Sequence, residues 1–282
     1  MLRWILPLLV LAGSSGCTDL FFVPLRQQVY TPEQLGIRPV DVQLQAADGT
    51  RLFAWQLPAE NPRGVICFFH GNAENISTHV INVAWLPAEG YEVLAVDYRG
   101  YGASAGTAEF PEVLQDVRAG LDWCLDRGRE LGRPVWALGQ SLGAALVLET
   151  VAQAPYREQL AGVVADSGFS GYRRIVRDAL SHGWLTWPFR YPLSLLVTGS
   201  HDPEVAVRDL APLPLLVLHS PQDSVVPYAH GERVFAAANS PKCFLRTGGP
   251  HIAALRAPEF RDTLLVFLAD TGAGAPLRCP AL

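Results

Sequence analysis

Five short runs of consecutive apolar residues constrain the fold of this chain more than any other feature. The runs cover residues 64–69, 91–96, 135–138, 161–165 and 213–218. Runs without polar alternation predict strands that are covered on both faces, as in a parallel sheet. Helix-like segments occur at 76–89, 112–131, 142–154, 228–238 and 258–268. This alternation predicts a doubly wound α/β sheet with functional side chains at the carboxyl ends of its strands.

A different pattern precedes these runs. Residues 40–46 alternate apolar and polar side chains, Asp48-Gly49 is a turn signal, and 51–57 resumes the strand pattern. This order predicts an antiparallel hairpin. The body of the chain contains no internal repeat and no low-complexity linker, so we expect one domain over residues 40–270. An extended segment at 18–39 precedes it, and a tail at 271–282 follows.

The stretch 168–211 is longer than an ordinary connection and carries Trp184, Trp187, Phe189 and Tyr191. Its length predicts a cap over the pocket. The aromatic side chains would suit an apolar acyl chain, or they would pack a helix onto the sheet.

The charges of the chain argue against nucleic-acid binding. The 282 residues carry a formal net charge of −5, and acidic and basic residues are interspersed without a long run of either sign. Nothing in this pattern attracts a polyanion.

The first seventeen residues have the composition of an export signal. Arg3 precedes an apolar run at 4–12 that is too short to span a bilayer, and small residues at 13–16 lead to Cys17. Gly16-Cys17 resembles the bacterial lipobox, although Ser14 stands where leucine is usual. The resemblance implies lipidation of Cys17 and a membrane-anchored envelope lipoprotein that faces the periplasm. Thr18 in the next position favours the outer membrane, while ordinary cleavage or a retained anchor are the alternatives.

Four further cysteines lie in the body and the tail. Cys67 falls in a strand-like run and Cys124 in a helix-like one, where buried thiols behave as small apolar residues. Cys243 and Cys279 could pair and fix the tail, but the sequence leaves this open.

The most specific chemical motif is Gly-Gln-Ser-Leu-Gly at 139–143, which follows one predicted strand directly and opens a predicted helix. A sharp strand-to-helix turn of this kind exposes its serine above the sheet, and the glycines leave room for the turn. The helix N-terminus favours a developing oxyanion. We therefore predict that Ser141 is a nucleophile.

A serine nucleophile needs a base and an acid that orients the base, and these follow it in the order acid, histidine. His251 lies in a loop before the last helix and is predicted to be the base. Asp223, in the loop after the strand at 213–218, is the predicted acid. Asp166, at the end of the preceding strand, is the alternative. Backbone N–H groups of Asn72 and Leu142 are the expected oxyanion hole.

The remaining histidines are predicted to have structural roles. His182, His201, His219 and His230 follow the serine but lack the required loop, so we interpret them as surface or packing residues. His70 precedes the serine and sits in a tight turn, which favours a scaffold role.

Three motifs together identify a family resemblance. His-Gly-Asn-Ala-Glu-Asn at 70–75, Asp-Tyr-Arg-Gly-Tyr-Gly at 97–102 and Gly-Gln-Ser-Leu-Gly at 139–143 resemble single-domain serine hydrolases of the α/β-hydrolase family. The resemblance covers residues 40–268 in order. It implies the α/β-hydrolase fold, hydrolysis of acyl esters or thioesters, including lipid ones, and a scaffold role for Asp97 and Arg99. The chain departs from the pattern at Gly248-Gly249-Pro250, where proline could shift the histidine loop.

Three functions are therefore to be compared. The first is an esterase, lipase or thioesterase that forms an acyl-enzyme on Ser141, the second is an aminopeptidase with the same three residues, and the third is a non-catalytic envelope binding protein. The intact set of Ser141, Asp223 and His251 argues against the third. The histidines lack zinc-ligand spacing and no phosphate-binding glycine loop is present, so we expect neither a metal nor a nucleotide cofactor.

Overall fold

The structure is a computed structural model, and it describes residues 22–153, 155–181, 186–197 and 201–279. The predicted signal segment with Cys17, and also His182 and Trp184, lie outside the described residues. So does the side chain of Trp187.

A mixed sheet of eight strands forms the centre of the molecule, in the spatial order β1-β2-β4-β3-β5-β6-β7-β8. The first two strands form the predicted antiparallel hairpin, and β2 pairs antiparallel with β4. All pairings from β4 to β8 are parallel. The predicted α/β-hydrolase fold is thereby confirmed. The strands are β1 (Val40–Gln45), β2 (Arg51–Leu57), β3 (Gly64–Phe69), β4 (Tyr91–Asp97), β5 (Val135–Gln140), β6 (Gly162–Asp166), β7 (Leu215–His219) and β8 (Lys242–Arg246).

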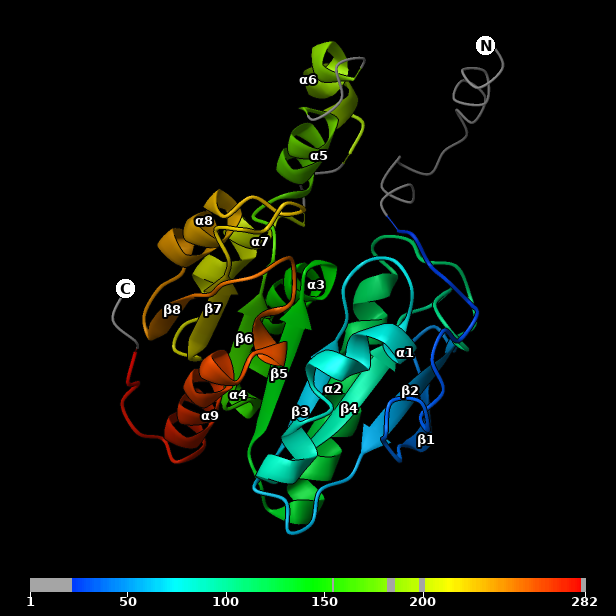
Figure 1. Ribbon diagram of the computed structural model, residues 1–282, viewed down its shortest axis with the longest axis vertical. Coiled ribbons are helices and arrows are strands. Elements are labelled where there is room, and N and C mark those ends of the chain that lie inside the picture. Colours follow the sequence, from blue (N-terminus) through cyan, green and yellow to red (C-terminus); the bar gives the residue numbers. More distant parts are fainter. Residues whose placement is uncertain (1–21, 154, 182–185, 198–200, 280–282) are drawn as a thin grey trace.

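Helices cover both faces of the sheet (Figure 1). The α-helices are α1 (Ile76–His79), α2 (Val113–Leu131), α3 (Leu142–Val151), α4 (Tyr156–Gln159), α5 (Tyr172–Ser181), α6 (Arg190–Ser194), α7 (Pro203–Ala206), α8 (Ala229–Ala237) and α9 (Pro258–Gly272). Short 3-10 helices are η2 (Val80–Asn82), η3 (Leu86–Glu89), η4 (Trp187–Phe189), η5 (Val207–Asp209) and η6 (Ala254–Arg256). Apolar side chains of α2, α3 and α8 belong to one core, and those of α1 and α9 belong to the other.

Strand β3 shows why its apolar run is continuous. Val65, Cys67 and Phe69 belong to one core, while Ile66 and Phe68 belong to the other. All five side chains are fully buried. Because successive side chains of a strand point to opposite faces, a strand covered on both sides needs apolar residues at every position.

Two segments differ from the sequence prediction. The helix expected at 76–89 is a single α-helical turn, α1, followed by η2 and η3. Pro87 and the left-handed Gly90 end this region, and the Asn82 side chain turns inward to Gln140. The edge strand β8 was not predicted at all, because Lys242 and Arg246 bracket only three buried residues.

The long segment 168–211 contains α5, α6 and α7, and α5 and α6 project beyond the carboxyl ends of the strands (Figure 1). Phe189 is 57% exposed and Tyr191 is 58% exposed. The expected core packing is therefore wrong for these two aromatic residues, while their contact with an acyl chain stays a prediction. Among the described helices, none is both long enough and apolar enough to span a membrane.

The cysteines of the body and tail divide into one pair and two buried thiols. A disulfide joins Cys243 of β8 to Cys279 of the tail, which answers the question that the sequence left open. Cys67 and Cys124 are buried free thiols, as predicted.

Replacing Gly143 by alanine tests how tightly α3 packs on the sheet. A Cβ at this position would lie 2.1 Å from the carbonyl oxygen of Phe69, so backbone would have to move. Alanine normally stabilises a helix by about 1 kcal/mol over glycine. Here we expect Gly143→Ala to lower the free energy of unfolding by about 3 kcal/mol or more. Urea denaturation measures this change.

Gly248 offers a matched control. A Cβ there would have no neighbour closer than Phe260 Cζ, at 3.7 Å. We expect Gly248→Ala to change the free energy of unfolding by less than about 1 kcal/mol. Equal stability of the two variants would contradict the packing described here.

Candidate active site

Two glycines make the turn at Ser141 possible. A Cβ at Gly139 would lie 2.4 Å from the carbonyl oxygen of Gly143, and a Cβ at Gly143 would lie 2.1 Å from that of Phe69. Both distances are shorter than any non-bonded contact. Only glycine therefore allows β5 to turn directly into α3 against the end of β3.

Ser141 occupies the strained position in this turn. Its φ of +53° and ψ of −112° lie outside the regions that side-chain-bearing residues prefer. The surrounding packing holds it there, and its N–H donates to the carbonyl oxygen of Asp166 at 2.8 Å. Ser141 is also the N-cap of α3, so the Leu142 N–H belongs to the first helical turn, which has no acceptor within the helix. The predicted nucleophile thus lies beside a free helix N-terminus.

The predicted base and the predicted acid are in direct contact. His251 Nδ1 and Asp223 Oδ2 are 2.6 Å apart, and Asp223 Oδ1 accepts hydrogen bonds from the N–H groups of Val225 and Val226. Because a carboxylate only accepts, Nδ1 carries the proton and Nε2 has a free lone pair. Burial alone would raise the pKa of Asp223, but the hydrogen bonds from His251 and the two amides outweigh it and lower the pKa. The carboxyl group is therefore ionised at neutral pH.

The loop that carries the acid also holds the loop that carries the histidine. Ser220 Oγ donates to the carbonyl oxygen of Gly249 at 2.7 Å, and the Gly249 N–H donates to Gln222 Oε1 at 2.7 Å. Gly249 adopts the left-handed conformation, with φ of +84°. Pro250 therefore does not prevent the contact between His251 and Asp223.

Gln140 ties the serine turn to the histidine loop, and the sequence analysis missed this role. Its Nε2 donates to Asp166 Oδ2 at 2.7 Å and approaches the carbonyl oxygen of Ile252 at 3.5 Å. Its Oε1 accepts from Asn82 Nδ2 at 2.7 Å, and Asn82 in turn accepts from Arg256. Ile252 has a φ of +53°, which is rare for a β-branched residue. The neighbour of the serine thus supports the strained neighbour of the histidine.

Asp166 is occupied by these structural contacts. Its oxygens accept from Gln140 and from Ser167 Oγ, and the side chain is fully buried. Burial raises the pKa of Asp166, and the hydrogen bonds offset this only in part. Of the two candidate acids, Asp223 is the one that contacts His251.

The serine and the histidine are not hydrogen-bonded to each other. Within the described residues, neither Ser141 Oγ nor His251 Nε2 has a hydrogen-bond partner. Ser141 is 8% exposed. Catalytic hydrogen bonds are often long or misaligned without substrate and tighten when it binds.

The predicted oxyanion loop packs against the serine turn. A Cβ at Gly71 would lie 3.4 Å from Ser141 Cβ, so the residue before Asn72 nearly touches the serine. Asn72 Oδ1 accepts from the N–H groups of Val23 and Ala73 and from the Tyr101 hydroxyl. These bonds fix the backbone next to Ser141.

Behind this loop, His70 and Asp97 form a buried scaffold. His70 Nδ1 is 2.7 Å from the carbonyl oxygen of Gly71, and Nε2 is 3.3 Å from Asp97 Oδ1. Asp97 Oδ1 also accepts from the Ile76 N–H. His79 stacks on His70, and burial, followed by the nearby His70, lowers the pKa of His79 to about 3. These contacts give both histidines structural partners.

Arg99, the other predicted scaffold residue, is also buried. It forms ion pairs with Asp116 and Asp48, which connect α2 to the turn of the hairpin. In the sequence, Arg99 is distant from all three candidate catalytic residues.

His219 is not a surface residue, and it faces the acid. His219 is fully buried. Its Nε2 lies 2.9 Å from the carbonyl oxygen of Val226 and 3.6 Å from Asp223 Oδ2. Since a carbonyl only accepts, Nε2 is the protonated nitrogen. Burial lowers the pKa of His219, so it is neutral at pH 7. It therefore shapes the environment of Asp223.

His230 belongs to a second arrangement of serine, histidine and aspartate. Its Nδ1 accepts from the Ser170 N–H at 3.0 Å and lies 3.0 Å from Ser170 Oγ, and its Nε2 is 2.8 Å from Asp178 Oδ2. Ser170 is fully buried and the backbone amide already occupies Nδ1. This set joins α8 to the segment after β6 and does not form a second nucleophile.

The described residues contain no cluster of three or more histidine, cysteine, aspartate or glutamate side chains that could hold a metal ion.

Comparisons with known proteins identify the family. Residues 60–213 match the model of a family described as serine aminopeptidase, S33. The protein YfhR of Escherichia coli strain K12 is 31% identical over 257 residues, which cover 88% of this chain and 86% of YfhR. The lysophosphatidylserine lipase ABHD12 of Xenopus tropicalis is 28% identical over 232 residues, or 73% of this chain and 58% of that protein.

Solved structures show the same fold. The Pyrococcus furiosus esterase PF2001 superposes with a TM-score of 0.70 at 21% identity, over 88% of this chain and 97% of the esterase. The chain belongs to the serine aminopeptidase S33 family of α/β hydrolases.

Proposed function

We propose that this protein hydrolyses carboxylic ester or thioester bonds through an acyl-enzyme on Ser141. The observation that carries the proposal is the 2.6 Å contact between His251 Nδ1 and Asp223 Oδ2, in the same fold as a serine at a strained helix N-terminus. This contact leaves His251 Nε2 as a base, and a serine hydroxyl requires such a base to react.

The proposed reaction has two stages. In the first, His251 Nε2 takes the proton of the Ser141 hydroxyl while Oγ attacks the acyl carbon. N–H groups of Leu142 and Asn72 stabilise the oxyanion. The imidazolium, held by Asp223, gives its proton to the departing alcohol or thiol. Water then attacks the acyl-enzyme by the same steps and releases the acid.

Two comparisons support ester substrates. One similar solved structure is an esterase, and one sequence relative is a lysophosphatidylserine lipase. The family description instead favours an aminopeptidase. Parallel assays of p-nitrophenyl butyrate and amino-acid p-nitroanilides separate the two functions, and we expect turnover of the ester alone.

The proposed location is the bacterial envelope, with a lipid on Cys17. The sequence before Cys17 supports export, and the disulfide between Cys243 and Cys279 is typical of oxidising compartments such as the periplasm.

Ser141→Ala tests the nucleophile. Without Oγ no acyl-enzyme forms, so we expect kcat for p-nitrophenyl butyrate to fall by about three orders of magnitude or more. Circular dichroism checks that the variant folds. Activity equal to that of the unmodified protein would exclude Ser141.

Asp223→Asn and Asp166→Asn form a matched pair, since each replaces a buried carboxylate by an amide. Asparagine at 223 no longer holds the His251 tautomer, and we expect kcat to fall by about 10³ to 10⁴-fold. Asp166 contacts Gln140 and Ser167, and we expect a loss of less than about tenfold. The reverse ranking of the two losses would identify Asp166 as the acid.

Cys17→Ser tests the anchor. We expect the expressed variant to leave the membrane fraction and appear in the soluble fraction, as detected by immunoblotting, because no acyl chain can be attached. Continued association with membranes would point to an uncleaved apolar segment.

A further inference from the structure

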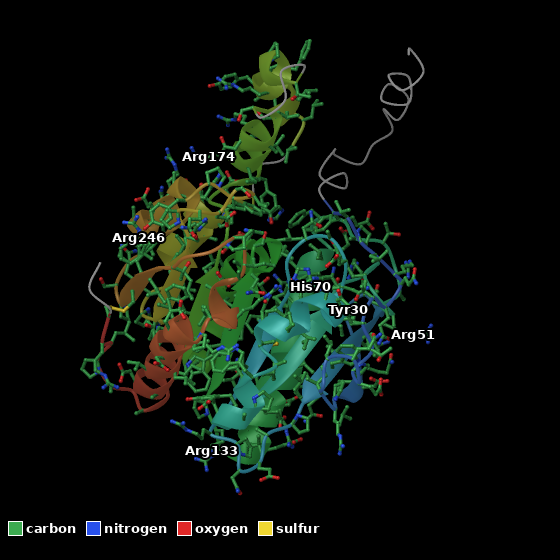
Figure 2. The ribbon with its side chains drawn as sticks, viewed as in Figure 1. Tyr30, Arg51, His70, Arg133, Arg174 and Arg246 are labelled. Carbon is green, nitrogen blue, oxygen red and sulfur yellow. A yellow bond between two sulfur atoms is a disulfide. The ribbon has the colours of Figure 1, made fainter. Side chains whose placement is uncertain are left out.

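A cavity of about 380 Å³ lies where the projecting helices meet α8. Its walls come from α5, α6 and the start of α8, and Pro227 lies only four residues after the proposed acid Asp223. Figure 2 shows Arg174 at this end of the molecule and Arg133 at the opposite end.

The lining of this cavity is strongly basic. It includes Arg174, Arg177, Arg190 and Arg233, against the single carboxylate of Asp178. The chain as a whole carries a formal net charge of −5, so the charge of this cavity is opposite in sign to that of the whole chain. Asp178 Oδ2 is engaged by His230, and Arg174 pairs with Glu204 at 3.0 Å. Even when Glu204 is counted, the four arginines outnumber the two carboxylates, and the cavity keeps a net positive charge.

Several guanidinium donors in the cavity have no protein acceptor. Arg177 Nε donates to the carbonyl oxygen of Arg173, and no other hydrogen bond of its guanidinium is formed within the described residues. Among the residues that the structure describes, Arg233 has no side-chain hydrogen bond or ion pair, and Arg174 Nε is buried without a hydrogen-bond partner. Guanidinium groups bind phosphate through paired N–H donors. Arg177 and Arg233 supply such donors from two different helices.

The short segment from Gly168 to Ser170 lies between the serine turn and the wall of this cavity. His230 lines it and is held by the N–H of Ser170. Two residues earlier, Gly168 packs on the start of α3, where an added Cβ would lie 3.8 Å from the carbonyl oxygen of Ser141. One short segment therefore touches the nucleophile turn at one point and the wall of the cavity at another.

We propose that this arginine cavity binds the phosphate group of the substrate, so that the preferred substrate is an acyl ester with a phosphate on its alcohol part. The inference rests on the proposed ester hydrolysis at Ser141. The phosphate could belong to a lipid or to a small soluble ester. Binding in the cavity anchors the alcohol part while the acyl carbon reaches Ser141.

The test compares two substrates that differ only in the phosphate: butyryl-glycerol 3-phosphate and butyryl-glycerol. We expect the full-length protein to hydrolyse the phosphate ester with at least about tenfold higher kcat/KM. In Arg177→Gln/Arg233→Gln this preference falls to about twofold or less, while kcat/KM for butyryl-glycerol changes less than twofold. Arg133→Gln, at the opposite end of the sheet, keeps the full preference. Palmitoyl-glycerol 3-phosphate in place of the butyryl ester shows whether the lipid or the soluble source is preferred.

Binding of glycerol 3-phosphate to Ser141→Ala, measured by calorimetry, separates this inference from the proposed function. Binding that is lost when Arg177→Gln/Arg233→Gln is added supports the cavity even if no ester is hydrolysed. Two results would contradict phosphate binding in the cavity: ester hydrolysis without a phosphate preference, and glycerol 3-phosphate binding that survives the arginine substitutions. Neither result would contradict the proposed role of Ser141.

Discussion

The close contact between the start of α3 and the end of β3 is the constraint on which the rest of the site depends. The carbonyl oxygen of Phe69 occupies the space that a Cβ at Gly143 would need. This contact leaves the chain no room for an ordinary loop between β5 and α3, and it forces Ser141 into a left-handed turn. It also brings the first amides of α3 next to the loop that follows β3. One packing contact thus positions both the proposed nucleophile and the proposed oxyanion donors.

The histidine side of the site is held by contacts that do not involve the side chain of Ser141. Asp223 fixes the ring of His251, Ser220 and Gln222 hold Gly249, and Gln140 reaches the carbonyl oxygen of Ile252. Because these bonds do not involve Ser141 Oγ, the imidazole is positioned before any contact with the hydroxyl forms. In the proposed mechanism, a hydrogen bond between Ser141 Oγ and His251 Nε2 then completes the set when substrate binds.

The sequence predicted the parts of the fold that local patterns encode. Five strands buried on both faces appear as apolar runs, and the turn at Ser141 appears as a glycine spacing. It did not reveal β8, because an edge strand flanked by Lys242 and Arg246 has no continuous apolar run. The roles of Gln140 and His219 depend on contacts with residues that are distant in sequence. The arginine cavity is equally hidden, since Arg177 and Arg233 meet only when α5 and α8 are packed.

Labelling with a fluorophosphonate, followed by mass spectrometry of the digested protein, tests whether Ser141 is an activated nucleophile. The reagent traps a serine only where a base activates it. We expect one modification, on the peptide that contains Ser141, at a rate that falls at least a hundredfold in His251→Ala. Modification of another residue, or labelling of Ser141 at an unchanged rate without His251, would exclude this role.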